Sequence, residues 1–163
     1  MGKFADDVQE TFRDALAERL PSRSWETEYP VRRTPVDVAS PDVPHVFVEV
    51  EMRRADPSNN PVKLARYASE GDFDAPLLLV QVFSGYYDLT SGGVSSKRRN
   101  AEFVGELGTE ALDGFAYRAV DLGFTPPKRG GERPDGWRAE VATVADEIAS
   151  LLDGDDTLVE EVL

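Results

Sequence analysis

The sequence has no cysteine and only one histidine, His45, among its 163 residues. Disulfides, zinc–thiolate centres, iron–sulfur clusters and thiol nucleophiles are therefore excluded. A single histidine also argues against multi-histidine metal sites and most histidine-based catalytic triads. Any chemistry must then come from carboxylates, hydroxyls, amides and lysine.

Long apolar runs are missing as well. No stretch reaches the roughly 18 residues that a membrane-spanning helix requires, and the N-terminus lacks the apolar segment of a signal peptide. We therefore expect a cytoplasmic protein with no membrane partner and no organic small-molecule cofactor. A chain of this length fits one domain around one core.

Lysine is scarce. The chain has four lysines, Lys3, Lys63, Lys97 and Lys128, and fourteen arginines. Acidic residues are abundant, with 31 Asp and Glu against 18 Lys and Arg and a net charge of −13. This composition resembles that of salt-in halophiles and predicts a halophilic host or its virus. In about 1 M salt the Debye length is roughly 3 Å, so the net charge does not repel DNA at a distance. Local clusters of charge are more informative than the sum.

Apolar periodicity predicts an α/β protein with the element order αβββαβαβα. We expect one domain over 1–153, built on a mixed central sheet with helices on both faces, and an acidic tail over 154–163. The predicted helices cover 3–20, about 60–70, 96–112 and 137–152, and the predicted strands cover 25–33, 35–39, 45–53, 77–83 and 115–122. In the third helix the spacing predicts that Phe103 and Leu107 are buried.

Three carboxylates occupy strand positions that usually carry apolar side chains. Asp37 lies between Val36 and Val38, and Glu49 and Glu51 alternate with valines in a strongly apolar strand. Carboxylates are rarely buried unless they are paired or bind a metal. Either arginines or a divalent cation must then neutralise the group, and oxygen ligands favour Mg²⁺, Mn²⁺ or Ca²⁺. Alternatively, the alternation of valine and glutamate marks the wet face of an antiparallel strand.

The arrangement around these carboxylates resembles the PD-(D/E)XK nuclease superfamily, which has the restriction-endonuclease-like fold. An early helix precedes Asp37 in the motif PVDV, and Glu49 and Glu51 follow in VFVEVE in the next strand. The resemblance covers about residues 3–83. It implies that Asp37 and Glu49 are metal ligands and that Glu51 stands where most members carry lysine. In the E-x-E minority of the family the second glutamate acts as a base or as a further ligand.

Three further residues are candidates for the same site. Lys63 in NPVKLARY is the candidate for the lysine that most members of the family use, although its helical position also suits a solvent-facing side chain. Glu18 is the candidate for the glutamate that some members add from the first helix. Gln81 interrupts an apolar strand, so it either approaches the site or is a satisfied amide at the sheet edge.

Basic residues cluster in spite of the acidic background, which favours a nucleic-acid interface. The candidates for phosphate contacts are Arg53, Arg54, Lys97, Arg98 and Arg99. Tyr86 and Tyr87 precede the second of these clusters and are candidates for stacking on an exposed base. For each cluster the alternative is a solvated surface or ion pairs with the many acids.

These residues predict a Mg²⁺-dependent endonuclease-like protein, with Mn²⁺ as a substitute ion, which hydrolyses DNA phosphodiester bonds through Asp37, Glu49 and Glu51. An alternative is a non-catalytic member of the same fold that binds DNA or acts as an assembly component. A third possibility is an acidic α/β module that binds only other proteins. The expected partners are DNA and a second copy of the chain or a larger complex.

Overall fold

The computed structural model of the protein describes residues 2–153, so the predicted acidic tail, 154–163, lies outside the described residues. The elements are α1 (Lys3–Arg19), β1 (Glu26–Val31), β2 (Thr34–Ser40), β3 (His45–Glu51), α2 (Asn59–Ser69), β4 (Leu77–Phe83), a 3-10 turn (Gly85–Tyr87), α3 (Ser96–Ala111), β5 (Phe115–Asp121) and α4 (Trp137–Asp153). The predicted element order is confirmed, and the predicted bounds differ by only a few residues.

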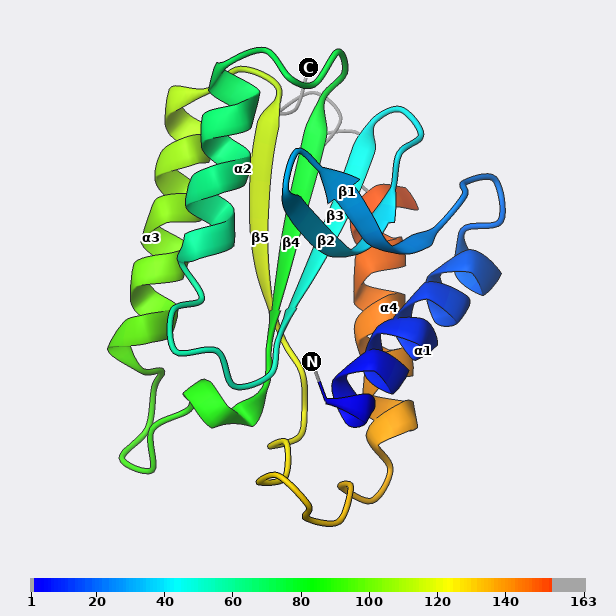
Figure 1. Ribbon diagram of the computed structural model, residues 1–163, viewed down its shortest axis with the longest axis vertical. Coiled ribbons are helices and arrows are strands. Elements are labelled where there is room, and N and C mark those ends of the chain that lie inside the picture. Colours follow the sequence, from blue (N-terminus) through cyan, green and yellow to red (C-terminus); the bar gives the residue numbers. More distant parts are fainter. Residues whose placement is uncertain (1, 154–163) are drawn as a thin grey trace.

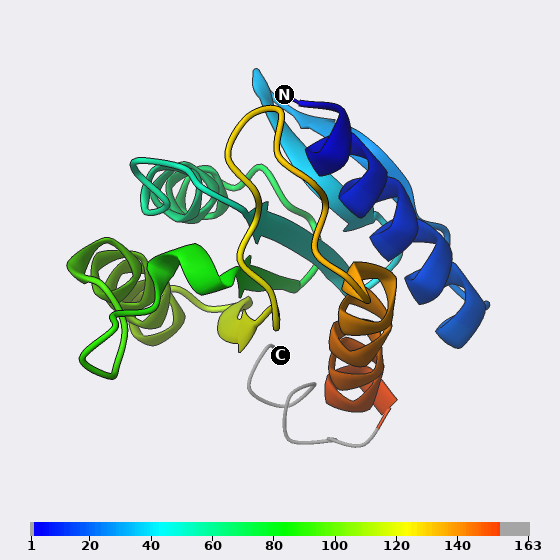
Figure 2. The ribbon, with the colours of Figure 1, turned by 90° about the horizontal axis from the view of Figure 1, so that it is seen from below.

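The strands form one five-stranded sheet in the order β1-β2-β3-β4-β5 (Figure 1). β1, β2 and β3 are antiparallel neighbours, whereas β3, β4 and β5 run parallel. α1 and α4 lie together on one face of the sheet, and α2 and α3 cover the other (Figures 1 and 2). The predicted α/β class, with a mixed sheet covered on both faces, is therefore confirmed.

The alternation of side chains along β3 divides the core into two layers. Val46, Val48 and Val50 are buried beneath α1 and α4, and full burial of each valine stabilises the fold by about 1.5–3 kcal/mol. Phe47 points to the opposite face, where it packs with the apolar side chains beneath α2. Glu51 follows on that second face, so the strand period carries a carboxylate into a buried layer.

α3 is rotated relative to the prediction. The helical spacing predicts burial of Phe103 and Leu107, but they are 64% and 51% exposed. The glycines of the helix lie against the sheet instead, because a Cβ at Gly105 would overlap the ring of Tyr117 and one at Gly108 would lie 2.9 Å from Phe115. Two aromatic rings of β5 thus require a glycine surface on α3, and this requirement turns its larger side chains outward.

None of the helices within residues 2–153 is long and apolar enough to cross a bilayer. The longest are α1 and α4, with 17 residues each, and both carry several charged side chains.

Candidate active site

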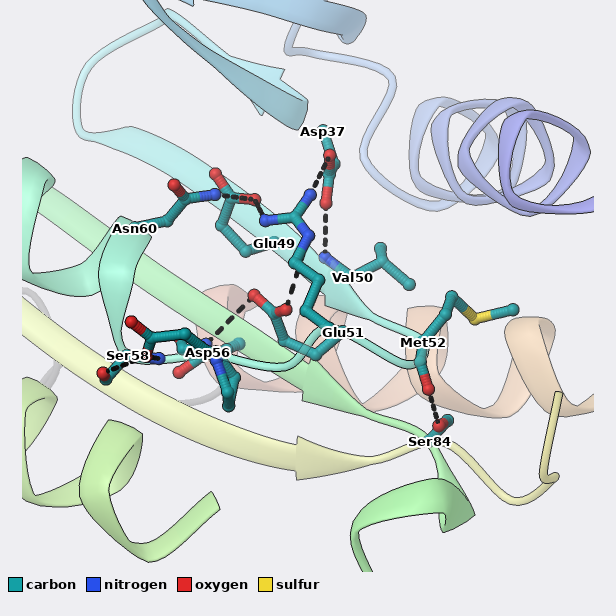
Figure 3. Close-up of polar contacts among 12 residues, drawn as sticks. Asp37, Glu49, Val50, Glu51, Met52, Asp56, Ser58, Asn60 and Ser84 are labelled. Carbon is teal, nitrogen blue, oxygen red and sulfur yellow. Dashed lines mark hydrogen bonds and ion pairs between the residues drawn. The ribbon is translucent and has the colours of Figure 1, made fainter. Parts of the chain in front are cut away.

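Asp37 on β2 and Glu49 and Glu51 on β3 come together where the paired part of the two strands ends (Figure 3). We call these three residues the carboxylate cluster. Their exposed fractions are between 0% and 2%. The alternative of a wet strand face is therefore wrong, because both glutamates are buried beneath side chains from other elements.

The side chain of Asp37, rather than a backbone carbonyl of β2, accepts the next hydrogen bond from β3. The ladder between β2 and β3 runs from Ser40 opposite Val46 to Val38 opposite Val48. One residue further, Oδ2 of Asp37 accepts a 2.8 Å hydrogen bond from the amide of Val50. The carboxylate thus satisfies a buried amide just where the strands separate, which fixes its orientation.

The guanidinium of Arg54 lies among the three carboxylates. Its nitrogens are 3.4 Å from Oδ1 of Asp37, 3.8 Å from Oε2 of Glu49 and 3.7 Å from Oε2 of Glu51. These distances exceed the roughly 2.7–2.9 Å of a tight charge-assisted hydrogen bond. Arg54, which the sequence suggested as a phosphate contact, is therefore the cation that the carboxylate cluster holds, and it is held loosely.

Burial dominates the electrostatics of the carboxylate cluster. It raises the pKa of Asp37, although Arg54 and the amide of Val50 act in the opposite direction. It raises the pKa of Glu49 well above its ordinary range, and the charges of Asp37 and Glu51 raise it further. It also raises the pKa of Glu51, to about 7, against the opposing charge of Arg54. One arginine therefore does not neutralise the cluster, which favours either bound protons or an additional cation.

Neutral side chains from several elements orient the carboxylates. Gln9 of α1 donates to Oδ1 of Asp37 at 3.0 Å, and Asn60 of α2 donates to Oε2 of Glu49 at 3.3 Å. Gln81 of β4 donates to Oε1 of Glu51 at 3.1 Å, and the hydroxyl of Tyr117 donates to Gln81 at 2.6 Å. Gln81 therefore approaches the site, which is the first of the two alternatives predicted for it.

Sequence reasoning missed Gln9 and proposed Glu18 as the residue that α1 contributes. Glu18 is exposed, whereas Gln9 is buried against Asp37. Gln9 lies at helical spacing with the buried residues Phe12 and Leu16, so a polar side chain on the apolar face of α1 was the available signal.

A cleft of about 490 Å³ opens beside Asp37 of the carboxylate cluster. Asp37, Arg54 and Asn60 line its side toward the cluster, and Lys63 and Arg33 add two further cations. The predicted candidate Lys63 is half-buried and shares this cleft with Asp37, so it does not simply face solvent. The lining is mixed in charge, because Asp6 and Glu28 stand beside Asp37 and the three cations. The cations Arg33, Arg54 and Lys63 are the groups that could contact a phosphate-bearing ligand there.

The donor set of the carboxylate cluster suits a hard cation in kind. Oε1 of Glu49 and Oε2 of Glu51 are buried and have no hydrogen-bond partner among residues 2–153, so each glutamate retains an oxygen for a ligand. Carboxylate oxygens are the preferred ligands of Mg²⁺ and Mn²⁺. Within residues 2–153, however, no three acidic or histidine side chains already converge on a metal position. Because the guanidinium of Arg54 lies within 4 Å of all three carboxylates, an ion that bound all three would displace it.

The structure corrects two of the predicted nucleic-acid contacts, namely Arg98 as a phosphate contact and Tyr87 as a stacking residue. Arg98 is only 6% exposed, and it pairs with Glu102 at 3.1 Å and Asp121 at 2.5 Å. Tyr87 is fully buried, and its hydroxyl donates to the backbone oxygen of Arg54 at 2.9 Å. Both side chains fold back onto the sheet, so neither is available to a phosphate or a base.

The other basic candidates lie on the surface. Lys97 and Arg99 are exposed at the start of α3. Arg53 is exposed as well, and its guanidinium lies 5.0 Å from the ring centre of Tyr86 in a cation–π contact. Arg53 and Tyr86 therefore form one surface feature directly beside the carboxylate cluster.

Comparison of the chain with models of protein families, with curated proteins and with solved structures finds no match. Support for a function therefore comes from the residues of the site.

Proposed function

We propose that this protein is a Mg²⁺-dependent endonuclease-like enzyme that hydrolyses phosphodiester bonds of DNA at the carboxylate cluster. The observation that carries the proposal is the burial of Asp37, Glu49 and Glu51 around Arg54, with two carboxylate oxygens that find no hydrogen-bond partner in the described part of the chain. Buried carboxylates with too little positive charge around them are characteristic of cation sites. The resemblance of this motif to the PD-(D/E)XK superfamily agrees with the same chemistry.

Asp37 and Glu49 would hold the ion, each already oriented by one neutral side chain and Asp37 also by a backbone amide. When bound, the ion would supply Lewis-acid stabilisation of the scissile phosphate and a more acidic water. Glu51, whose pKa burial raises to about 7, is suited to accept a proton from the attacking water near neutral pH. Lys63 would place a positive charge beside the substrate phosphate in the cleft.

The proposal is tested by titrating Mn²⁺ calorimetrically into the wild type and Glu49→Gln in KCl-rich buffer, with plasmid cleavage assayed in the same buffers. Glu106→Gln is the matched control, because it makes the same chemical change at an exposed position of α3. We expect Glu49→Gln to lose both Mn²⁺ binding and cleavage and Glu106→Gln to keep both. Cleavage that persists in Glu49→Gln would contradict the proposal.

A second candidate function is a catalytically inactive protein of the same fold that binds DNA or acts in the assembly of a larger complex. The observation in its favour is the guanidinium of Arg54, which already supplies positive charge within 4 Å of all three carboxylates. The same titration separates the two candidates. DNA binding without any Mn²⁺ binding by the wild type would select this second function.

A further inference from the structure

A second cleft, of about 740 Å³, lies between the first turn of α1, the end of β3 and the segment 126–133. We call it the basic groove. Five of its lining residues are cations, namely Lys3, Arg53, Lys128, Arg129 and Arg133, and no acidic residue within 2–153 lines it. The protein has a net charge of −13, so the positive charge of this groove is opposite in sign to the charge of the chain as a whole. The basic groove is electrostatically complementary to a polyanion.

Most of these cations are available to a ligand. Arg133 pairs with Asp7 at 2.7 Å. Among the described residues no carboxylate forms an ion pair with Lys3, Lys128 or Arg129, all of which are exposed. Arg53 donates to the backbone oxygen of Pro126 at 3.5 Å and contacts the ring of Tyr86.

Apolar side chains complete the basic groove. Phe4, Met52, Pro126 and Pro127 line it beside the cations. Phe4 is fixed by edge contact with the ring of Trp137, at a centroid distance of 5.2 Å. In both ribbon views the segment between β5 and α4 passes beside the first turn of α1, which shapes this wall (Figures 1 and 2). The groove therefore offers apolar surface and positive charge together.

The basic groove is connected to the carboxylate cluster. A smaller cavity of about 220 Å³ shares Met52 and Arg53 with the groove and is also lined by Gln9 and Arg54. Gln9 donates a hydrogen bond to Asp37, and Arg54 lies among the three carboxylates. The basic groove and the carboxylate cluster are therefore neighbours, joined by the small cavity that Gln9 and Arg54 line.

We propose that the basic groove binds an unpaired nucleic-acid strand and leads it to the carboxylate cluster, a role that rests on the proposed phosphodiester hydrolysis. The volume of the groove lies within the roughly 300–1,000 Å³ of small-ligand pockets, a size that accommodates a few nucleotides. Unpaired bases need an apolar or aromatic surface, whereas paired bases already stack on one another. The phosphates contact Lys3, Lys128 and Arg129, and a base packs on the Arg53–Tyr86 pair.

The test measures binding of a labelled single-stranded oligothymidylate and of a duplex of the same length, in chelator so that no strand is cleaved. The variant Lys128→Ser/Arg129→Ser removes two exposed cations of the groove. Its matched control, Arg13→Ser/Arg66→Ser, removes the same charge from α1 and α2 outside the groove. Thermal denaturation verifies that both variants remain folded.

We expect the wild type to bind the single strand more tightly than the duplex. In the groove variant, the slope of log K against log salt should fall by about 1.4, because each phosphate that a cation neutralises on a single strand adds about 0.7 to the slope. The control should keep the wild-type slope. Equal weakening of binding in the two variants, tighter binding of the duplex, or no binding by the wild type would each overturn the inference. Groove-dependent binding in chelator, together with no cleavage by the wild type when Mn²⁺ replaces the chelator, would overturn the proposed function alone.

Discussion

The amide of Val50 donates a 2.8 Å hydrogen bond to Oδ2 of Asp37, and this single bond continues the pairing of β2 with β3 beyond Val38. Asp37 therefore has a structural role as well as its proposed role in the site. The two roles predict different effects for two substitutions of this one residue.

Asp37→Ala leaves the buried amide of Val50 without an acceptor, and an unsatisfied buried donor costs about 1–3 kcal/mol. Asp37→Asn keeps an oxygen that accepts from the amide of Val50. The side-chain amide of Gln9 can rotate so that its oxygen accepts from the NH₂ group that the asparagine introduces. We expect urea denaturation in chelator to find Asp37→Asn clearly more stable than Asp37→Ala, with Mn²⁺ binding weakened in both. Equal stability of the two variants would show that the hydrogen bond to Val50 is not what Asp37 contributes.

Arg54 and a divalent cation are expected to compete for the carboxylate cluster. Arg54→Met removes the positive charge and leaves three buried carboxylates facing one another. Removing one partner of a buried ion pair costs up to about 3–5 kcal/mol, reduced here because 35% of the Arg54 side chain is exposed. In chelator we therefore expect a lower melting temperature than that of the wild type.

Mn²⁺ should raise the melting temperature of Arg54→Met more than that of the wild type, since an ion that binds only the folded state stabilises it by mass action. The measurement is thermal denaturation over a series of Mn²⁺ concentrations, with Arg66→Met as a control for the loss of an arginine outside the site. An identical Mn²⁺ response in Arg54→Met and the wild type would rule out competition between Arg54 and the metal.

The raised pKa of Glu51 predicts that the stability of the metal-free protein depends on pH. The pKa of Glu51 is raised from 4.5 to about 7 by burial, so the folded protein binds this proton more tightly than the unfolded chain. The proton therefore stabilises the fold below pH 4.5, and the stabilisation is lost as the pH rises through about 7. At about 1.4 kcal/mol for each pKa unit, the full effect is about 3 kcal/mol.

The measurement is the free energy of unfolding of the wild type and Glu51→Gln in chelator from pH 5 to pH 8. The difference between the two proteins cancels the contributions of the acids outside the carboxylate cluster and reports Glu51 together with its coupling to Asp37 and Glu49. We expect the wild type to lose stability relative to Glu51→Gln as the pH rises. A constant difference across this interval would mean that Glu51 does not titrate there.

The carboxylate cluster follows from strand periodicity and could be predicted. Residues two apart on a strand share a face, so Glu49 and Glu51 had to lie together, and β2 had to be close because few residues connect it to β3. The position of Arg54 could not be predicted in the same way. It depends on how the backbone turns after β3, which no periodic pattern encodes.

The loop and helix after β4 show a second limit. Arginine and tyrosine are residue types that commonly contact nucleic acids. Arg98 and Tyr87 are nevertheless both buried, and Arg98 is paired with Asp121 of β5. Burial of a charged or hydroxyl side chain depends on a partner distant in sequence, here 23 residues away. Local sequence therefore identifies such a residue without deciding whether it faces solvent.

The orientation of α3 has a similar cause, and it makes a testable prediction about stability. Alanine is better than glycine in a helix by about 1 kcal/mol, so helix propensity alone predicts that Gly105→Ala stabilises the protein. A Cβ at this position would overlap the ring of Tyr117, whose hydroxyl is held by Gln81 beneath the carboxylate cluster. Overpacking of this kind costs about 1–3 kcal/mol or more.

We therefore expect Gly105→Ala to lower the free energy of unfolding, and to do so through Tyr117. The double variant Gly105→Ala/Tyr117→Leu should lose less than the sum of the two single variants, because the smaller side chain makes room for the Cβ. Phe103→Ala, which changes a side chain that is 64% exposed on the same helix, should alter stability by at most about 0.5 kcal/mol. A stabilised Gly105→Ala, or a large loss in Phe103→Ala, would mean that α3 faces the sheet with its larger side chains, as the helical pattern alone predicts.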